Sequence, residues 1–237
     1  MATNEYGQPV GEPVADWQPR PPAGPVRLEG AWCRVEPLAD AHHDDLHDAL
    51  VLGSPPQLWT YLGAGPFADR APFEEYLARL STTPGSIPHV LVPHTGPSAG
   101  RAAGIACYLR GDVAAGSVEV GGLSFGAAIQ RSVVTTETMF LMMRHVFDDL
   151  GYRRYEWKCD ALNAASRAAA LRLGFRFEGV FRQALVYKGR NRDTAWFSIT
   201  DGEWHTLRQA YDDWLDASNF DSAGVQVRSL AALARRE

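Results

Sequence analysis

Several polar side chains of this chain stand where they could do chemistry, and Glu119 is the first of them. It lies between Val118 and Val120 in the apolar run Ser117–Gly121. Because the side chains of a strand alternate between its two faces, the Glu119 carboxylate points away from the valines. On the cleft side of a central strand it could accept a proton, directly or through water. A salt-bridged glutamate on a half-solvated strand face is the alternative.

Two further polar segments stand at the start of predicted helices. Gln130–Glu137 leads into a helix predicted over residues 139–150, and Asn163 and Ser166 follow a strand predicted over residues 155–160. The N-terminus of a helix carries unpaired N–H groups and a partial positive charge, so it favours anionic or electron-rich ligands. Capping alone would also explain Asn163, and Ser166 could simply lie in the first turn of its helix.

The elements that must position these residues form a mixed α/β pattern. We expect strands over residues 28–37, 89–93, 102–110, 117–121, 155–160 and 181–188, a last strand ending near 200, and helices over 41–52, 73–80, 139–150 and 203–217, with a short helix ending at 173–175. The pattern predicts three parts: a proline-rich arm (1–26), one domain (27–217) and a tail (218–237). The arm is either disordered or lies against the domain or a partner subunit, held by Trp17.

Composition excludes several classes of function. The net charge of −5 among 237 residues gives no electrostatic support for binding nucleic acid or an anionic membrane. No apolar run has membrane-spanning length, and the N-terminus lacks the pattern of a signal peptide, so a cytoplasmic protein is expected. Cys33, Cys107 and Cys159 are far apart and read as buried thiols on strands, and the histidines form no metal motif, so we expect no metal.

The order of the elements, with N-x-x-S at Asn163–Ser166 and L-G-F-x-x-E-G at Leu173–Gly179, resembles the GCN5-related N-acetyltransferase (GNAT) family. The resemblance is good over residues 100–201 and unspecific over 28–93. It implies an α/β (α+β) fold with a mixed, mostly antiparallel sheet of about seven strands flanked by helices. It also implies transfer of an acetyl or other short acyl group from coenzyme A to a primary amine.

In this family the pyrophosphate of coenzyme A binds a glycine-rich loop, written Q/R-x-x-G-x-G/A, before a helix. Here Val133 and Thr135 replace the glycines, and valine resists a positive φ. The resemblance implies that the cofactor site includes a β-bulge before this loop, the loop itself and Asn163, which would contact the pantetheine arm. The implied cofactor-binding residues are Ser124, Phe125, Gly126, Gln130, Arg131, Val133, Val134, Thr135, Thr136 and Asn163.

The resemblance also implies roles in catalysis. Glu119 would be the base or would organise a water molecule. Many members carry a tyrosine acid where this chain has Ala170, so Ser166 becomes the candidate that acts on the leaving sulfur, as in the branch of the ribosomal-protein alanine acetyltransferases. The implied acceptor pocket contains Trp59, Tyr61, Tyr187 and Asp193.

The acceptor itself stays open between a small-molecule amine and a peptide N-terminus, and a homodimer is reasonable. Two alternatives remain. A non-catalytic domain that has lost its cofactor would explain the missing glycines and the missing tyrosine. The same fold could also run another reaction, such as decarboxylation of a malonyl thioester.

Overall fold

A computed structural model describes residues 2–222 and 224–234. Its centre is one sheet with the strand order β3-β4-β5-β6-β7-β8-β10-β9. The strands are β3 (Leu28–Glu29), β4 (Cys33–Pro37), β5 (Ser86–Pro93), β6 (Gly104–Asp112), β7 (Ser117–Phe125), β8 (Arg154–Asp160), β9 (Arg176–Tyr187) and β10 (Arg190–Thr200). Neighbouring strands of this sheet are antiparallel except β7 and β8, which are parallel. The expected mixed, mostly antiparallel sheet is confirmed, with eight strands.

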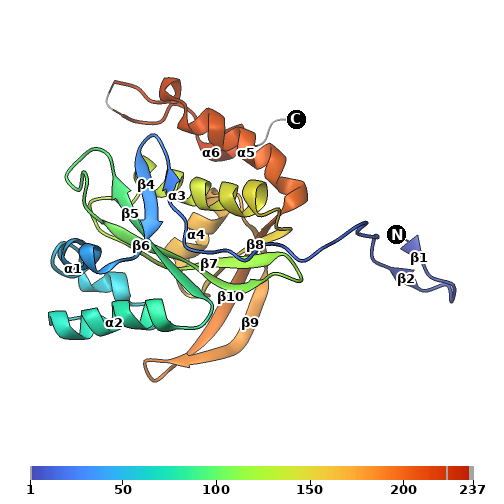
Figure 1. Ribbon diagram of the computed structural model, residues 1–237, viewed down its shortest axis with the longest axis horizontal. Helices are drawn as coiled ribbons and strands as arrows, with labels where there is room; N and C mark the ends of the chain where they lie inside the picture. Colours follow the sequence, from blue (N-terminus) through green and yellow to red (C-terminus); the bar gives the residue numbers. More distant parts are fainter. Residues whose placement is uncertain (1, 223, 235–237) are drawn as a thin grey trace.

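Helices cover both faces of the sheet (Figure 1). One face carries α3 (Val133–Arg144), α4 (Ala164–Arg172), α5 (Asp201–Leu215) and α6 (Leu230–Leu233), with η4 (His145–Asp149) and η5 (Ala217–Asn219). The other carries η1 (Asp40–His42), α1 (His43–His47), η2 (Asp48–Leu52), η3 (Pro56–Trp59) and α2 (Arg70–Thr82). Each layer buries its apolar side chains in its own core, so the sheet is held from both sides.

Several element boundaries differ from the sequence expectation, and two of the differences have a clear cause. The strand expected over residues 28–37 is a hairpin of β3 and β4, because the Glu137 carboxylate accepts hydrogen bonds from the backbone N–H groups of Ala31, Trp32 and Cys33 in the turn. The helix expected from residue 139 already begins at Val133, after Ser132 in an extended conformation. The sequence gives no amphipathic pattern that marks the start of this helix, because polar and apolar residues of its first half are buried alike.

The parallel pair β7 and β8 separates partway along its length. Pairing runs from Ser117 with Arg154 to Val120 with Trp157 and then stops, although both strands continue. Beyond that point β7 has a bulge against β6, because Cys107 pairs with Gly121 but Ile105 pairs with Ser124. The bulge bends β7 away from β8 and opens the sheet at this place.

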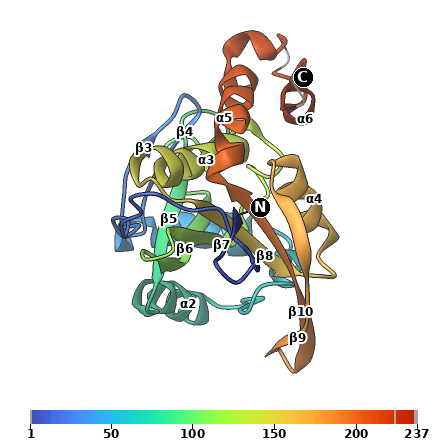
Figure 2. The same cartoon turned by 90° about the vertical axis from the view of Figure 1, so that its right-hand side faces the viewer.

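The N-terminal arm lies against the domain from Trp17 onward, one of the two arrangements expected from its composition. The Trp17 indole N–H donates to the Ala114 carbonyl at 2.7 Å. Further along, the Val26 N–H donates to Nε2 of the buried His89. The first residues form a small separate hairpin of β1 (Ala2–Thr3) and β2 (Pro9–Val10), which projects from the body of the molecule (Figures 1 and 2).

The segment after α5 also packs onto the domain. The Phe220 ring contacts Trp214 and Trp32, and Leu230 and Leu233 of α6 are buried. The sequence of this segment shows no clear helical or strand periodicity. Its buried apolar side chains nevertheless cover the end of the larger core.

Candidate active site

The opening between β7 and β8 is the mouth of a cavity of about 610 Å³. Its walls come from the ends of both strands, from α4, from the η3 region and from β10. The lining residues include Leu58, Tyr61, Leu62, Arg110, Glu119, Gly121, Gly122, Leu123, Phe125, Gln130, Trp157, Lys158, Cys159, Asp160, Asn163, Ser166 and Arg192. Side chains therefore do not plug the place where the two strands part.

Glu119 lies in this wall, and its side chain is almost fully buried. Its Oε2 accepts a hydrogen bond from Arg110 Nε at 2.8 Å and lies 3.0 Å from Lys158 Nζ. Lys158 also pairs with Glu156 at 2.8 Å and lies over the Trp196 ring, 3.6 Å from its centroid. Both cations contact the same oxygen, so Oε1 makes no ion pair among the described residues. The glutamate is thus a carboxylate held in one orientation at the cavity wall.

Two glycines of the bulge, Gly121 and Gly122, present backbone instead of a side chain to the cavity. Gly122 has a φ of +60°, and a Cβ at Gly121 would lie 2.9 Å from Glu119 Oε1. Gly121, Gly122 and Leu123 lie past the last pair with β8, so their backbone groups on that side face the cavity instead of a strand. The expected bulge before the loop stands at Gly122–Leu123, where glycine adopts a positive φ without strain.

The loop before α3 avoids the conflict expected at Val133. The positive φ of this loop falls on Arg131 (+56°), while Val133 already has helical backbone. Gln130 anchors the loop, since its side-chain amide donates to the Phe125 carbonyl at 2.8 Å. No side chain caps the first turn of α3 among the described residues, so its leading N–H groups stay available to a ligand.

The two threonines of this helix point inward. Thr135 and Thr136 are buried, and both hydroxyls donate to the Ser132 carbonyl. Arg172, at the end of α4, donates to the Thr136 hydroxyl at 3.1 Å. A second arginine besides Arg131 therefore stands beside the start of α3.

Asn163 and Ser166 form the start of α4 at the cavity. The Asn163 side chain caps the helix by accepting from the Ser166 N–H at 3.0 Å. The Ser166 hydroxyl accepts from the Trp157 indole at 3.0 Å and lines the cavity, as does Cys159. Burial raises the pKa of the Cys159 thiol, so it stays protonated near neutral pH. Since its oxygen accepts from Trp157, the Ser166 hydroxyl can still donate its own proton.

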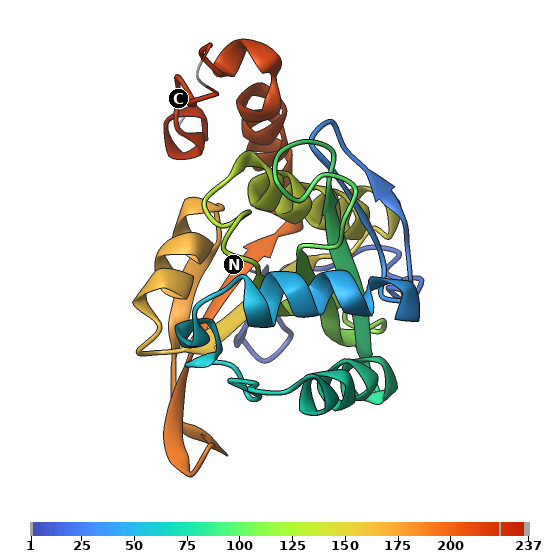
Figure 3. The same ribbon diagram turned by 90° about the vertical axis from the view of Figure 1, so that its left-hand side faces the viewer.

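The far end of the cavity lies below the η3 region. Figure 3 shows this segment between α1 and the β9–β10 hairpin, and Lys188 Nζ donates to the Trp59 carbonyl at 2.6 Å across that contact. Tyr61 lines the cavity, and the Tyr187 hydroxyl donates to Asp160 Oδ2 at 2.7 Å. Burial and then the neighbouring Asp160 raise the pKa of Tyr187 to about 12.

Two residues expected in the acceptor pocket lie elsewhere. The Trp59 ring is 1% exposed and packs among Phe67, Phe73 and Tyr76 in the smaller core. It is drawn there because three aromatic rings offer it edge-to-face contacts.

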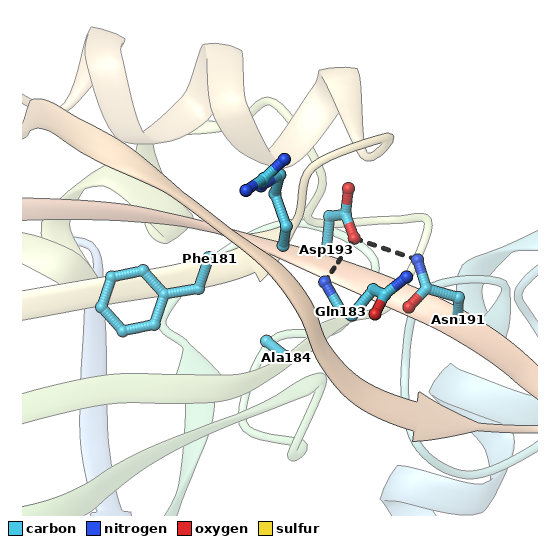
Figure 4. A pocket seen from close by; sticks show the side chains of 6 residues that line it. Phe181, Gln183, Ala184, Asn191 and Asp193 are labelled. Atoms are coloured by element: carbon cyan, nitrogen blue, oxygen red, sulfur yellow. Dashed lines mark hydrogen bonds between the residues drawn. The ribbon is translucent and has the colours of Figure 1, made fainter.

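Asp193 belongs to a separate hollow of about 800 Å³ on the β9–β10 hairpin (Figure 4). Its carboxylate accepts from the Gln183 N–H and the Asn191 side chain. The Gln183 N–H and then Asn191 hold the pKa of Asp193 below its usual range. Asp193 thus fixes the bulge of β9 at Gln183, whose φ is +51°.

Sequence reasoning missed the charged partners of the site. Arg110, Lys158, Asp160 and Arg192 converge on the cavity from β6, β8 and β10, and no local pattern marks them. The pair Gly121-Gly122 inside a strand was a usable signal, because glycines in a strand often mark a bulge.

Comparisons with known proteins agree with this geometry. A family model described as "Acetyltransferase (GNAT) domain" matches residues 34–176. A crystal structure of a GCN5-related N-acetyltransferase from Brucella melitensis is 44% identical, with a TM-score of 0.89, over 93% of this chain and 99% of that one. A probable acetyltransferase of the GNAT family from Chromobacterium violaceum is 37% identical, with a TM-score of 0.75, over 83% and 97%. This chain therefore belongs to the GNAT acetyltransferase family.

A more distant structure shares the fold alone. It is the acetyltransferase from Salmonella typhimurium that modifies the N-terminal serine of ribosomal protein L7/L12, 18% identical with a TM-score of 0.62 over 74% of this chain and 99% of that one. No protein of curated function matches the chain.

The described residues contain no cluster of three or more His, Cys, Asp or Glu side chains able to hold a metal ion. Within the same residues, every helix is too short or too polar to cross a bilayer.

Proposed function

We propose that this protein transfers an acetyl or another short acyl group from coenzyme A to the primary amine of a small molecule or a protein N-terminus. The observation that carries the proposal is the separation of β7 and β8 after Val120 and Trp157. It leaves an open cavity with a buried carboxylate, Glu119, in its wall. The pantetheine arm would lie between the strands and use the backbone groups that have lost their partners.

The residues present fit coenzyme A. Uncapped N–H groups at the start of α3, with Arg131 and Arg172 beside them, would bind the pyrophosphate. Arg131 supplies the positive φ of the loop, so the missing glycines need not abolish binding. Asn163 would contact the pantetheine arm.

The residues around the cavity suggest a role for each of them in the transfer reaction. The amine nitrogen attacks the carbonyl carbon of the thioester, the carbon–nitrogen bond forms, and the carbon–sulfur bond breaks. Glu119 takes the amine proton, and the Ser166 hydroxyl donates a hydrogen bond to the departing sulfur, which is finally protonated from solvent. Backbone N–H groups of the Gly122–Leu123 bulge would polarise the carbonyl.

Calorimetry and a thiol-release assay test the proposal. We expect acetyl-CoA to bind with micromolar affinity and amines from a mixed panel to release free coenzyme A. No binding at millimolar acetyl-CoA would leave a non-catalytic domain as the function. Turnover of malonyl-CoA without an amine would instead indicate decarboxylation.

We also propose that this chain belongs to the branch of the family that contains the ribosomal-protein alanine acetyltransferases. Ser166 in the N-x-x-S pattern and Ala170 in place of the tyrosine support that branch. A peptide that begins with alanine or serine, added to the amine panel, tests it directly.

We also propose a cytoplasmic homodimer. The three cysteines are free and buried, as suits a reducing compartment. Strand β9 is an edge of the sheet and exposes Phe181 and Val186, the second to 81%. Exposed apolar edges are commonly covered by another chain. Light scattering during size-exclusion chromatography tests this, and a monomer at high concentration would overturn it.

A further inference from the structure

The cavity wall contains one cation that has no anionic partner. Arg192 of β10 lines the cavity and lies over the Tyr187 ring, 5.7 Å from its centroid. Its Nε is buried and has no hydrogen-bond partner. Within residues 2–222 and 224–234, no carboxylate forms an ion pair with its guanidinium.

The neighbouring charges of the site are all satisfied. Arg110 and Lys158 both pair with Glu119. The carboxylate of Asp160 accepts from the Tyr187 hydroxyl and from the Leu162 N–H, so it is already engaged. Arg192 therefore stands out as the unneutralised cation of the cavity.

A half-buried guanidinium without a carboxylate partner is unfavourable unless an anion neutralises it. Arginine presents a planar fork of donors that matches a carboxylate in two hydrogen bonds. The contact of its guanidinium carbon with the Tyr187 ring is a cation–π contact, which uses none of the N–H donors of the fork. The missing partner is thus an anion with the geometry of a carboxylate.

Arg192 lies away from the β7 bulge and the start of α3, which are assigned to the thioester carbonyl and the pyrophosphate of coenzyme A. It stands on β10, on the far side of β8 from β7 and its bulge. Its neighbour Tyr187 donates to Asp160, which lines the cavity, and the next residue, Lys188, contacts the Trp59 carbonyl of η3. We propose, on the basis of the acyl transfer argued above, that Arg192 binds a carboxylate of the acceptor. The acceptor is then an amine that also bears a carboxylate, such as an amino acid or a short peptide.

The test uses matched pairs of probes. A panel of N-acetylated amino acids, which resemble the product, is compared with the corresponding N-acetylated amino acid amides by ligand-observed NMR, with and without coenzyme A. We expect at least one carboxylate to bind about 10 to 100 times more tightly than its amide, the range for a hydrogen-bonded charge. Arg192→Gln should remove this preference and leave the affinity of the amide unchanged.

Two variants complete the design. Arg192→Lys keeps the charge without the fork and should retain part of the preference, and it serves if the glutamine variant does not fold. Arg190→Gln removes an exposed cation of the same strand and should change nothing.

The outcomes separate this inference from the proposed function. A wild-type protein that prefers no carboxylate over its amide overturns the role of Arg192. If Arg192→Gln weakens coenzyme A itself by tenfold, the arginine serves a phosphate and the inference is wrong. A protein that binds the carboxylates but not coenzyme A would keep the Arg192 site and refute the transferase.

Discussion

Lys158 and Glu119 are joined across the place where the sheet opens, with 3.0 Å between Nζ and Oε2. The last pair between the two strands is Val120 with Trp157. Glu119 comes one residue before Val120 on β7, and Lys158 comes one residue after Trp157 on β8. The ion pair therefore closes the paired part of the two strands and faces the cavity on its other side. The same ion pair therefore holds the two strands together where their pairing ends and orients the carboxylate of the proposed base.

Replacement of Glu119 tests that role. We expect Glu119→Gln to lower kcat by about 100-fold or more, because general base catalysis supplies about 10²–10⁴. The affinity for acetyl-CoA should stay nearly unchanged. Glu156→Gln is the control, since Glu156 also bonds Lys158 but does not line the cavity. Equal turnover of the two variants, measured by thiol release, would remove Glu119 from the mechanism.

Ser166 should act on the leaving sulfur rather than on binding. In the Ser166→Ala variant we expect kcat to fall about tenfold or more, as for a lost hydrogen bond to a charged group. Trp157→Phe removes the donor that holds the hydroxyl and leaves the hydroxyl itself, so its loss should be smaller. The role in catalysis is refuted when Ser166→Ala turns over as fast as wild type in single-turnover experiments.

The bulge depends on Gly122. Its φ is +60°, and an added Cβ would lie 3.1 Å from Cys107 Sγ. We expect Gly122→Ala to lower the free energy of unfolding by about 1–3 kcal/mol and to weaken acetyl-CoA binding. Gly189→Ala is the control, because Gly189 has a similar φ of +70° but open space around it. If both variants bind acetyl-CoA equally well, the bulge does not shape the site.

The His89 ring makes the stability of the protein depend on pH. Burial lowers its pKa from 6.5 to about 4, and its neutral Nε2 accepts from the Val26 N–H while Nδ1 bonds the Ile87 carbonyl. Tyr108 packs on the ring, and His145 lies nearby. Above pH 6.5 both folded and unfolded His89 are neutral, so its contribution is complete. Between about pH 6.5 and 4 only the unfolded state gains the proton, and stability falls by about 3 kcal/mol at most.

Urea unfolding at about pH 8 and about pH 5 measures this change in free energy. His89→Gln removes the titrating group, so its loss of stability over the same interval should be smaller than that of wild type. The carboxylates that also titrate remain in both proteins and cancel in the comparison. An identical loss in the two proteins would show that His89 carries no part of the pH dependence.

The order of elements and the direction of Glu119, away from its two neighbouring valines, were readable from the sequence, because both follow from local rules. Alternation along a strand places Glu119 opposite Val118 and Val120 whatever the rest of the chain does. The same holds for the three cysteines, which lie buried on β4, β6 and β8 as their apolar surroundings indicate.

The composition of the site was decided by the tertiary structure. Arg110 and Lys158 reach Glu119 from neighbouring strands, Trp59 turns into a core with rings from α2, and Asp193 is taken by the β9 bulge. The positive φ of the loop before α3 lies at Arg131 instead of Val133.

The sequence by itself therefore determined the order of the main strands and helices and the buried face of strands such as β7, since these depend on neighbours in the chain. Only the tertiary structure decided where β7 and β8 part, which charges are neutralised there and that Arg192 has no anionic partner among the described residues. Those properties depend on packing between residues far apart in the sequence, and no local pattern encodes such distances.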